Sequence, residues 1–306
     1  MRLVFAGTPE PAVASLRALA ATDHEIACVI TRRDAPVGRK RVLTASPVAV
    51  AADELGIDVL KTDRLDAAAT ERIAALEPDL GVIVAYGGLV REPLLGTPRL
   101  GWINLHFSLL PRWRGAAPVQ RALIAGDGET GTNVFQLTAG LDEGDVYGGT
   151  RYRIPPTATA GRVLEDLARD GAGALVDVVD QLAAGTARAL PQVGESTYAG
   201  KLTAEDGRLD WTQTADAVLS RFRGTTPEPG AFTTVDGVRV KIHDMQRAEH
   251  AAALSPGAIR AAQSEVLVGT ATDPVALVRV QPAGKAARAG GDWLRGLRAA
   301  EGLVAS

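Results

Sequence analysis

The stretch Leu80-Gly81-Val82-Ile83-Val84-Ala85 is apolar at every position and follows directly after Asp79. A short apolar run without polar alternation is typical of a strand buried on both faces, as at the centre of a parallel sheet. Runs of this kind alternate with segments of helical periodicity. The other strand-like runs are residues 2–6, 25–31, 58–60, 102–106, 132–137 and 146–153, and the helical segments include residues 47–55, 66–76 and 160–184. This alternation predicts an α/β fold with a doubly wound, Rossmann-like sheet.

The chain beyond about residue 185 has a different texture. Short β-rich runs lie at hairpin spacing, and Asp236-Gly237 between the first two is a hairpin turn signal. The runs are residues 231–235, 238–243, 258–262, 266–270 and 275–280. They predict a small OB-like β-barrel. We therefore expect a first domain at residues 1–188, a linker at 189–206 and a C-terminal barrel domain at 207–306.

The composition excludes several classes of protein. Of the 306 residues 46% are hydrophobic and 23% are charged, which favours a folded globular protein over a disordered one. The longest uncharged apolar stretch, residues 80–90, is far shorter than the ~20 residues that span a bilayer. The single cysteine, Cys28, cannot form an internal disulfide. We expect a cytoplasmic protein without a membrane partner, and a monomer because no apolar heptad pattern occurs.

Common nucleotide, metal and hydrolase motifs are missing. Gly7 stands alone where the G-x-G-x-x-G fingerprint needs three glycines, and no Walker A motif occurs. The four histidines show no zinc-binding spacing, so we expect no metal. Ser108 is not in a G-x-S-x-G elbow, which argues against a serine nucleophile.

Asn104 and His106 end a predicted strand. Side chains two residues apart in a strand share a face, so both should converge on one ligand at the carboxyl edge of the sheet. Asp142, in the turn-like segment Leu141-Asp142-Glu143-Gly144-Asp145, could orient an imidazole. Taken from the residues alone, a polar strand end with His106 hydrogen-bonded in place, and a solvated acidic loop at Asp142, remain open interpretations.

Matching stretches at residues 208–211, 227–231 and 281–285 extend a resemblance over essentially the whole chain, and three motifs in the first half carry it. They are Phe-Ala-Gly-Thr-Pro from residue 5, Asn-x-His-x-Ser-Leu-Leu-Pro-x-x-Arg-Gly-Ala-Ala-Pro from residue 104, and Leu-Asp-x-Gly-Asp from residue 141. In this order they resemble the methionyl-tRNA formyltransferase family. The resemblance implies transfer of a formyl group from 10-formyltetrahydrofolate to the methionine amine of initiator methionyl-tRNA, in translation initiation. It also implies a formyltransferase catalytic domain followed by a tRNA-binding domain.

The resemblance assigns roles to residues of this chain. It implies that Asn104, His106 and Asp142 form the catalytic trio. It implies a folate-binding loop and a pterin pocket made of Ser108, Leu109, Leu110, Pro111, Tyr86, Gly87, Gly88, Leu89, Leu141 and Asp145. Phe107, where the family usually has a small residue, departs from the pattern and bears on the pocket's shape.

The trio's chemistry agrees with formyl transfer. Charge develops on the carbonyl oxygen when an amine attacks a formyl carbon, and donors aimed there stabilise it. We expect the Asn104 amide and a protonated His106 to be those donors. Asp142 would raise the imidazole pKa and give the amine's proton a route away.

Basic residues gather in the polar loop that follows the second strand. We expect the tRNA-binding residues to be Arg32, Arg33, Arg39, Lys40 and Arg41, together with the basic residues Lys285 and Arg288 in the second domain. Arg39 matches the key loop arginine of the family, although the stretch Gly38-Arg39-Lys40-Arg41-Val42 is less regular than usual. An ordinary solvated basic surface is the alternative. Two alternative functions also stay open: formylation of a small amine, such as an amino-sugar nucleotide or glycinamide ribonucleotide, and an inactive module that binds folate or RNA.

Overall fold

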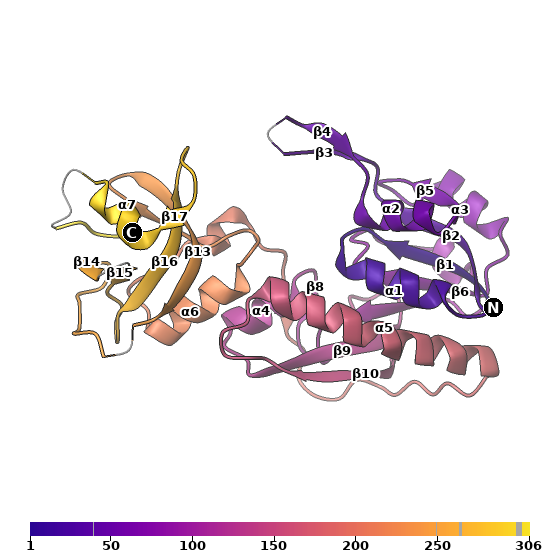
Figure 1. Cartoon of the computed structure of the whole chain (residues 1–306). Coiled ribbons are helices and arrows are strands. Elements are labelled where there is room, and N and C mark those ends of the chain that lie inside the picture. The colour runs from indigo at the N-terminus through magenta and orange to yellow at the C-terminus, as the bar shows by residue number, and fades with distance from the viewer. Residues whose placement is uncertain (39, 249, 263–264, 298–301) are drawn as a thin grey trace. The chain divides into compact units, whose positions relative to one another are not determined.

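The computed structural model describes residues 1–38, 40–248, 250–262, 265–297 and 302–306 (Figure 1). These residues form two compact units. The first contains Met1–Ala116, Glu129–Arg153 and Leu164–Ala199, and the second contains Ala117–Gly128, Ile154–Val163 and Gly200–Ser306. The domain boundaries placed at residues 188 and 207 stay a prediction.

The first unit is built on a seven-stranded sheet with strand order β10-β9-β7-β6-β1-β2-β5. Its strands are β1 (Arg2–Gly7), β2 (Glu25–Thr31), β5 (Val59–Lys61), β6 (Leu80–Val84), β7 (Trp102–His106), β9 (Glu129–Gln136) and β10 (Val146–Arg153). The five strands from β7 to β5 are parallel, as the sequence predicts. The sheet as a whole is mixed, because β9 runs antiparallel to both β7 and β10.

Both faces of this sheet are covered, which confirms the doubly wound α/β prediction. Every residue of β6 is buried, as its unbroken apolar run implies. In β1, Val4 and Ala6 pack with Ile73 of α3, while Leu3 and Phe5 alternate to the opposite face and are also buried. The helical elements of this unit are α1 (Pro11–Ala20), α2 (Pro47–Glu54), α3 (Ala67–Ala74), η1 (Leu94–Gly96) and α5 (Ala160–Ala184), whose residues from Leu164 belong to it.

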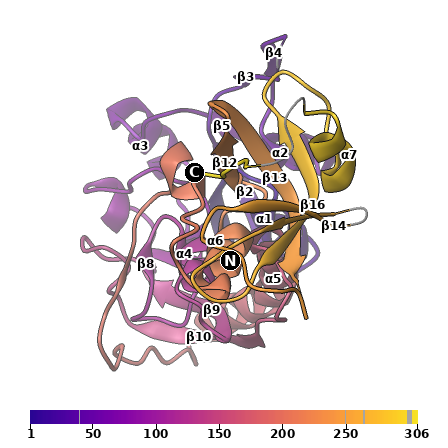
Figure 2. The same cartoon turned by 90° about the vertical axis from the view of Figure 1, so that its left-hand side faces the viewer.

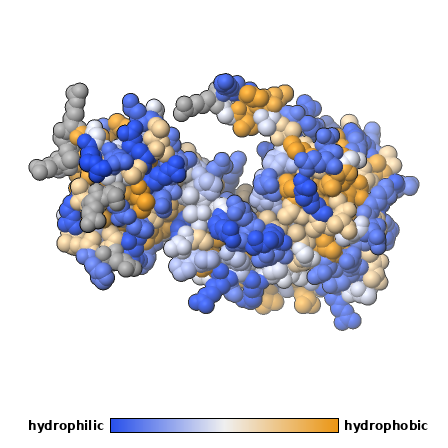
Figure 3. Space-filling model, viewed as in Figure 1, coloured by the Kyte–Doolittle hydropathy of each residue, from blue (hydrophilic) through white to orange (hydrophobic). Residues whose placement is uncertain are grey.

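The predicted polar loop after β2 contains a hairpin, which the sequence analysis missed. Strands β3 (Ala35–Val37) and β4 (Val42–Thr44) pair antiparallel, and the hairpin extends away from the sheet of its own unit (Figure 1). Its apolar side chains are exposed, Val37 by 57%, Val42 by 59% and Leu43 by 68%. Figure 3 shows these apolar groups mixed with polar ones along the hairpin. Because the hairpin buries no side chains in a core, its sequence shows no hydrophobic periodicity that would predict two strands.

Two short strands of the first unit lie next to the candidate site. β8 (Arg114–Gly115) pairs parallel with β11 (Tyr198–Ala199). Both consist of two residues, too short for any pattern in the sequence. Their pairing fixes the segment after α5 against the loop that follows β7.

The second unit is a curled antiparallel sheet, in agreement with the predicted OB-like module. Its elements are α4 (Pro118–Ile124), η2 (Ala204–Gly207), α6 (Ala215–Gly224), β12 (Phe232–Val235), β13 (Val238–Arg247), β14 (Ile259–Ala262), β15 (Glu265–Val268), β16 (Val275–Pro282), β17 (Arg288–Ala289) and α7 (Gly290–Arg295). The strand order is β12-β13-β16-β15-β14, with β17 on β16. Figure 2 shows β13 next to β16 in this sheet. Residues Val304 and Ala305 bridge to Ala258 and Val235, beside the two outer strands, and so draw the sheet's edges together.

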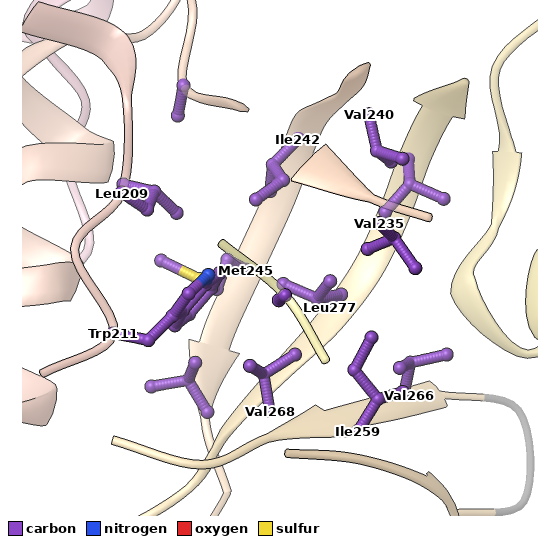
Figure 4. Close-up of a cluster of buried hydrophobic side chains, with 14 of the residues drawn as sticks. Leu209, Trp211, Val235, Val240, Ile242, Met245, Ile259, Val266, Val268 and Leu277 are labelled. Atoms are coloured by element: carbon purple, nitrogen blue, oxygen red, sulfur yellow. The ribbon is translucent and has the colours of Figure 1, made fainter. Parts of the chain in front are cut away.

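The curled sheet encloses a core of its own. Trp211, Met245 and Leu277 lie together among the buried branched side chains of the strands (Figure 4). The Trp211 indole satisfies its N–H by donating to Thr233 Oγ1 at 2.9 Å. No helix in the described part of the chain is long and apolar enough to cross a membrane.

Gly131 in β9 offers a direct test of the sheet edge beside the site. A Cβ there would overlap the Thr150 carbonyl oxygen and would lie 2.6 Å from Leu109 Cδ2, both well inside van der Waals distance. Since the Thr150 oxygen belongs to the paired strand β10, it cannot move aside without opening the ladder. We expect Gly131→Ala to lower the free energy of unfolding by about 3 kcal/mol.

Urea unfolding measures this loss. Gly128→Ala is the matched control, because a Cβ on Gly128 meets no atom within 4 Å among the described residues. It should change stability by less than about 0.5 kcal/mol. Equal stabilities for the two variants would contradict the packing argument.

Candidate active site

The end of β7 places Asn104 and His106 on one face of the sheet, as strand alternation predicts. His106 is 6% exposed and its ring meets the edge of Phe135 on β9, with centroids 6.3 Å apart and planes at 84°. Asn104 is half-buried, and its amide makes no hydrogen bond to any residue that the structure describes. The Asn104 amide is therefore available to a ligand, whereas the imidazole is held by the protein.

The tautomer of His106 follows from its contacts. Nε2 lies 2.9 Å from the Trp113 carbonyl oxygen. A carbonyl oxygen only accepts hydrogen bonds, so Nε2 carries a proton and donates it. Nδ1 then faces Oδ2 of Asp142, at 3.8 Å. In the neutral ring this leaves the lone pair of Nδ1 on the side of the carboxylate.

The protonated His106 expected from the sequence is wrong for this structure. Burial lowers the pKa of His106 below its ordinary value, because the charged ring would lose its hydration. Asp142 and the Trp113 carbonyl act in the opposite direction but do not outweigh burial. The lowered pKa favours the neutral imidazole, and the Asp142 carboxylate can stabilise an imidazolium that forms during a reaction.

Asp142 is held in one orientation by the backbone. Its side chain is 13% exposed, and Oδ2 accepts a hydrogen bond of 2.8 Å from the Gly115 amide. Residues 113–115 therefore hold both side chains of the pair. The Trp113 carbonyl oxygen accepts a hydrogen bond from His106, and the Gly115 N–H donates one to Asp142.

Three non-glycine residues around the site adopt left-handed backbone conformations. Ala85, directly after β6, has φ +47°, Trp113 has φ +61° and Asp142 has φ +48°. Such conformations cost free energy and cluster where a site over-determines the backbone. They mark the loops after β6, β7 and β9 as the functional side of this unit.

The loop after β7, implied to bind folate, is shaped by internal hydrogen bonds. Ser108 is fully buried and its Oγ donates to the Arg112 carbonyl oxygen at 2.6 Å. The Leu110 amide donates to Asn133 Oδ1 on β9 at 2.7 Å. Ser108 is accordingly a structural residue of the loop. Asn133, which the sequence analysis did not select, anchors the loop from a neighbouring strand.

The loop after β6 contains one buried aromatic ring, that of Tyr86, and one exposed apolar side chain, that of Leu89. Tyr86 is 3% exposed, whereas Leu89 is 69% exposed, and Leu141 of the loop after β9 is 51% exposed. Thr8 Oγ1 donates to the Tyr86 carbonyl oxygen at 3.3 Å, and Arg32 Nη2 donates to the Gly87 carbonyl oxygen at 3.0 Å. Exposed leucines on two fixed loops suit an apolar ring system.

A cavity of about 610 Å³ opens beside the turn at residues 143–145. Arg114 and Tyr147 bring polar groups to it, and Asp145 is the one residue implied to bind folate that lines it. The described residues contain no cluster of three histidine, cysteine, aspartate or glutamate side chains that could hold a metal ion.

Comparison with known proteins agrees with this arrangement. The formyl transferase family matches residues 1–179, and the formyl transferase C-terminal domain matches residues 201–298. A protein of Clavibacter sepedonicus named methionyl-tRNA formyltransferase is 59% identical over 297 residues, which cover 97% of this chain and 97% of that protein. The chain belongs to the methionyl-tRNA formyltransferase family. The resemblance found in the sequence is thereby confirmed.

Solved structures share the fold of this family member. HypX from Aquifex aeolicus in complex with tetrahydrofolic acid superposes with a TM-score of 0.67 at 17% identity, covering 97% of this chain and 48% of HypX. The chain thus spans about half the length of HypX. An N-formyltransferase from Helicobacter canadensis, solved with folinic acid and dTDP-3-aminofucose, has a TM-score of 0.70 at 15% identity and covers 92% of this chain and 98% of its own.

The basic residues expected to bind tRNA fall into two groups, exposed side chains without an ion pair to a described residue and one arginine that contacts the backbone. Lys40 and Arg41 in the hairpin, and Lys285 and Arg288 in the second unit, are exposed and form no ion pair with a described residue. Arg33 is also exposed. Arg32 instead reaches the Gly87 carbonyl, at the loop implied to hold folate. Arg39 lies outside the described residues.

Proposed function

We propose that this formyltransferase moves the formyl group of 10-formyltetrahydrofolate to the α-amine of methionine on initiator methionyl-tRNA. The arrangement that carries the proposal is the pair of buried His106 and half-buried Asp142, beside an Asn104 amide that makes no hydrogen bond to any described residue. The near full-length identity to a protein named for this activity supports it. Because initiator tRNA is charged and used where translation begins, we place the reaction in the cytoplasm.

The reaction needs one oxyanion donor and one proton acceptor. When the amine attacks the formyl carbon, negative charge grows on the carbonyl oxygen, and the Asn104 amide can donate a hydrogen bond to it. The amine must lose a proton as the new C–N bond forms. Neutral His106 can take that proton on Nδ1, with the Asp142 carboxylate stabilising the resulting imidazolium.

The proton that His106 takes from the amine is then transferred to the leaving group. The bond between the formyl carbon and the folate nitrogen breaks, and that nitrogen leaves more readily when it receives the proton from His106. Asp142 therefore acts on the imidazolium and need not be protonated itself, since its Oδ2 already accepts from the Gly115 amide. No covalent enzyme intermediate is required.

The folate donor would bind the loops around this trio. We propose that backbone groups of Tyr86–Leu89, Ser108–Pro111 and Leu141–Asp145 recognise its pterin ring, with Leu89 and Leu141 covering it. The exposure of both leucines supports this assignment. Phe107 is buried, at 6% exposed, so it affects the pocket only through packing.

Acceptor choice is the experiment that tests the function. The purified protein should formylate methionyl-tRNA with 10-formyltetrahydrofolate. It should leave glycinamide ribonucleotide and amino-sugar nucleotides unmodified under the same conditions. Uncharged initiator tRNA and already formylated methionyl-tRNA are the negative controls. Faster formylation of a small amine than of methionyl-tRNA would refute the proposed acceptor, and folate binding without any transfer would refute the enzyme.

The basic hairpin predicts a specific tRNA phenotype. Neutralising Arg39, Lys40 and Arg41 together should raise the KM for tRNA about tenfold or more and flatten its salt dependence, because each phosphate contact releases counterions. The folate KM should stay unchanged. Formylation rates against tRNA concentration at several salt concentrations measure both effects.

Arg64→Ala is the matched control for this variant, since Arg64 is exposed on the same unit outside the hairpin. It should leave the KM for tRNA and the salt slope as in the unaltered protein. Arg39→Ala alone should account for most of the triple variant's effect. A triple variant with the unaltered KM and salt slope would show that the hairpin does not contact RNA.

A further inference from the structure

The turn that carries Asp142 is held from one side by the segment that follows α5. Gln192 Nε2 donates to the Asp142 carbonyl oxygen at 2.8 Å and to the Gly144 carbonyl oxygen at 2.9 Å. One side-chain amide thus spans both ends of the three-residue stretch that contains Asp142. Asp142 has φ +48°, a strained backbone conformation for a non-glycine residue. The hydrogen bonds from Gln192 help to stabilise the peptide in this conformation.

Gln192 is itself fixed by an arginine from the loop after β7. Arg114 donates to Gln192 Oε1 from Nε at 3.1 Å and from Nη2 at 2.6 Å. Two donors of one planar guanidinium on one acceptor orient the amide and leave its NH₂ group aimed at the turn. Both hydrogens of Gln192 Nε2 are then used by the two carbonyl groups.

The contacts of Arg114 and its neighbours form a single frame. Arg114 lies between Trp113, whose carbonyl accepts from His106, and Gly115, whose amide donates to Asp142. The frame is tied to the segment after α5 by the Trp113 N–H on Thr197 Oγ1 at 2.8 Å and by the Arg114 N–H on the Thr197 carbonyl at 2.9 Å. His106 and Asp142 therefore depend on the same few residues for their relative position.

We infer that Gln192, oriented by Arg114, is a positioning residue that sets the Asp142 carboxylate at the distance from His106 that formyl transfer requires. This inference deepens the proposed function and rests on it. The Gln192 side chain donates to two backbone carbonyl oxygens of the turn, so it acts through the backbone of the turn. Small displacements of a charged partner at such a pair have a large effect on rate.

Gln192→Ala tests the inference by steady-state kinetics. The kcat for formylation should fall about tenfold while the KM for methionyl-tRNA stays within about twofold. Gln181→Ala is the matched control, an exposed glutamine on α5 of the same unit, and should leave both constants unchanged. Gln192→Glu keeps the side-chain length and the contact with Arg114 but loses the two donors, so it should lower kcat as alanine does.

A double-mutant cycle separates positioning from general destabilisation. If Gln192 acts through Asp142, Gln192→Ala should lower kcat less than twofold in a protein that already carries Asp142→Asn. An equal tenfold loss in both backgrounds would overturn the inference, and so would a single variant with unaltered kcat. Thermal unfolding of all variants checks that each is folded.

Hydrogen exchange gives a measure that does not need activity. Peptides covering residues 137–146 should exchange faster in Gln192→Ala than in the unaltered protein, and those of β6 should not. Unchanged exchange in that turn would also overturn the inference. If the unaltered protein failed to formylate methionyl-tRNA, the proposed function would fall, while exchange would still report whether Gln192 holds the turn.

Discussion

Asn104→Ala is expected to slow the chemical step of formyl transfer about 100-fold or more while folate affinity changes less than about threefold. The amide of Asn104 has no hydrogen-bond partner among the described residues, so its loss leaves no group of the protein unsatisfied. A donor aimed at a developing oxyanion stabilises the transition state far more than the bound substrate. Single-turnover formylation, measured beside folate binding, separates the two quantities.

Asn133 provides the contrast. Its Oδ1 accepts from the Leu110 amide in the loop after β7, so Asn133→Ala should weaken folate binding and disturb the loop. The two asparagines thus have opposite expected signatures, one in the rate of the chemical step and one in affinity. A near-normal single-turnover rate for Asn104→Ala would remove Asn104 from the oxyanion role.

The sheet could be predicted from the sequence because its strands carry a strong apolar signal. The ranges 25–31, 102–106 and 146–153 match β2, β7 and β10, and 160–184 matches α5. The hairpin β3–β4 escaped because three-residue strands that bury nothing leave no periodicity. Antiparallel pairing of β9 was not evident either, since strand direction depends on the connections between strands.

The site could be predicted only in part. Strand alternation alone puts Asn104 and His106 on one face, and the family motif adds Asp142. The protonation state of His106 was misjudged because burial, which lowers its pKa, depends on the whole fold. The Trp113 carbonyl and Gln192 were missed because a backbone acceptor has no residue signature and Gln192 lies 50 residues from Asp142 in the chain.

Asp142→Asn is expected to lower the maximal rate about 100-fold, because the imidazolium formed at His106 loses its counter-charge. The pH profile should move as well. In the unaltered protein the neutral imidazole is the active form, so the rate falls as the pH drops through the pKa of His106. Asp142 raises that pKa against the lowering effect of burial. Without the carboxylate the pKa falls further, and the acidic limb of kcat/KM should move to lower pH.

The direction of this shift discriminates between two roles for the carboxylate. Asparagine keeps an oxygen that can accept from the Gly115 amide, so the turn retains its shape and the change is one of charge. Glu71→Gln, which removes an exposed carboxylate on α3 of the same unit, is the matched control and should change neither the maximal rate nor the position of the acidic limb. A limb that stays in place, or moves to higher pH, in Asp142→Asn would mean that the rate does not depend on a neutral His106 stabilised by Asp142. Such a result would mean that a group of the site other than His106 acts as the acid–base catalyst.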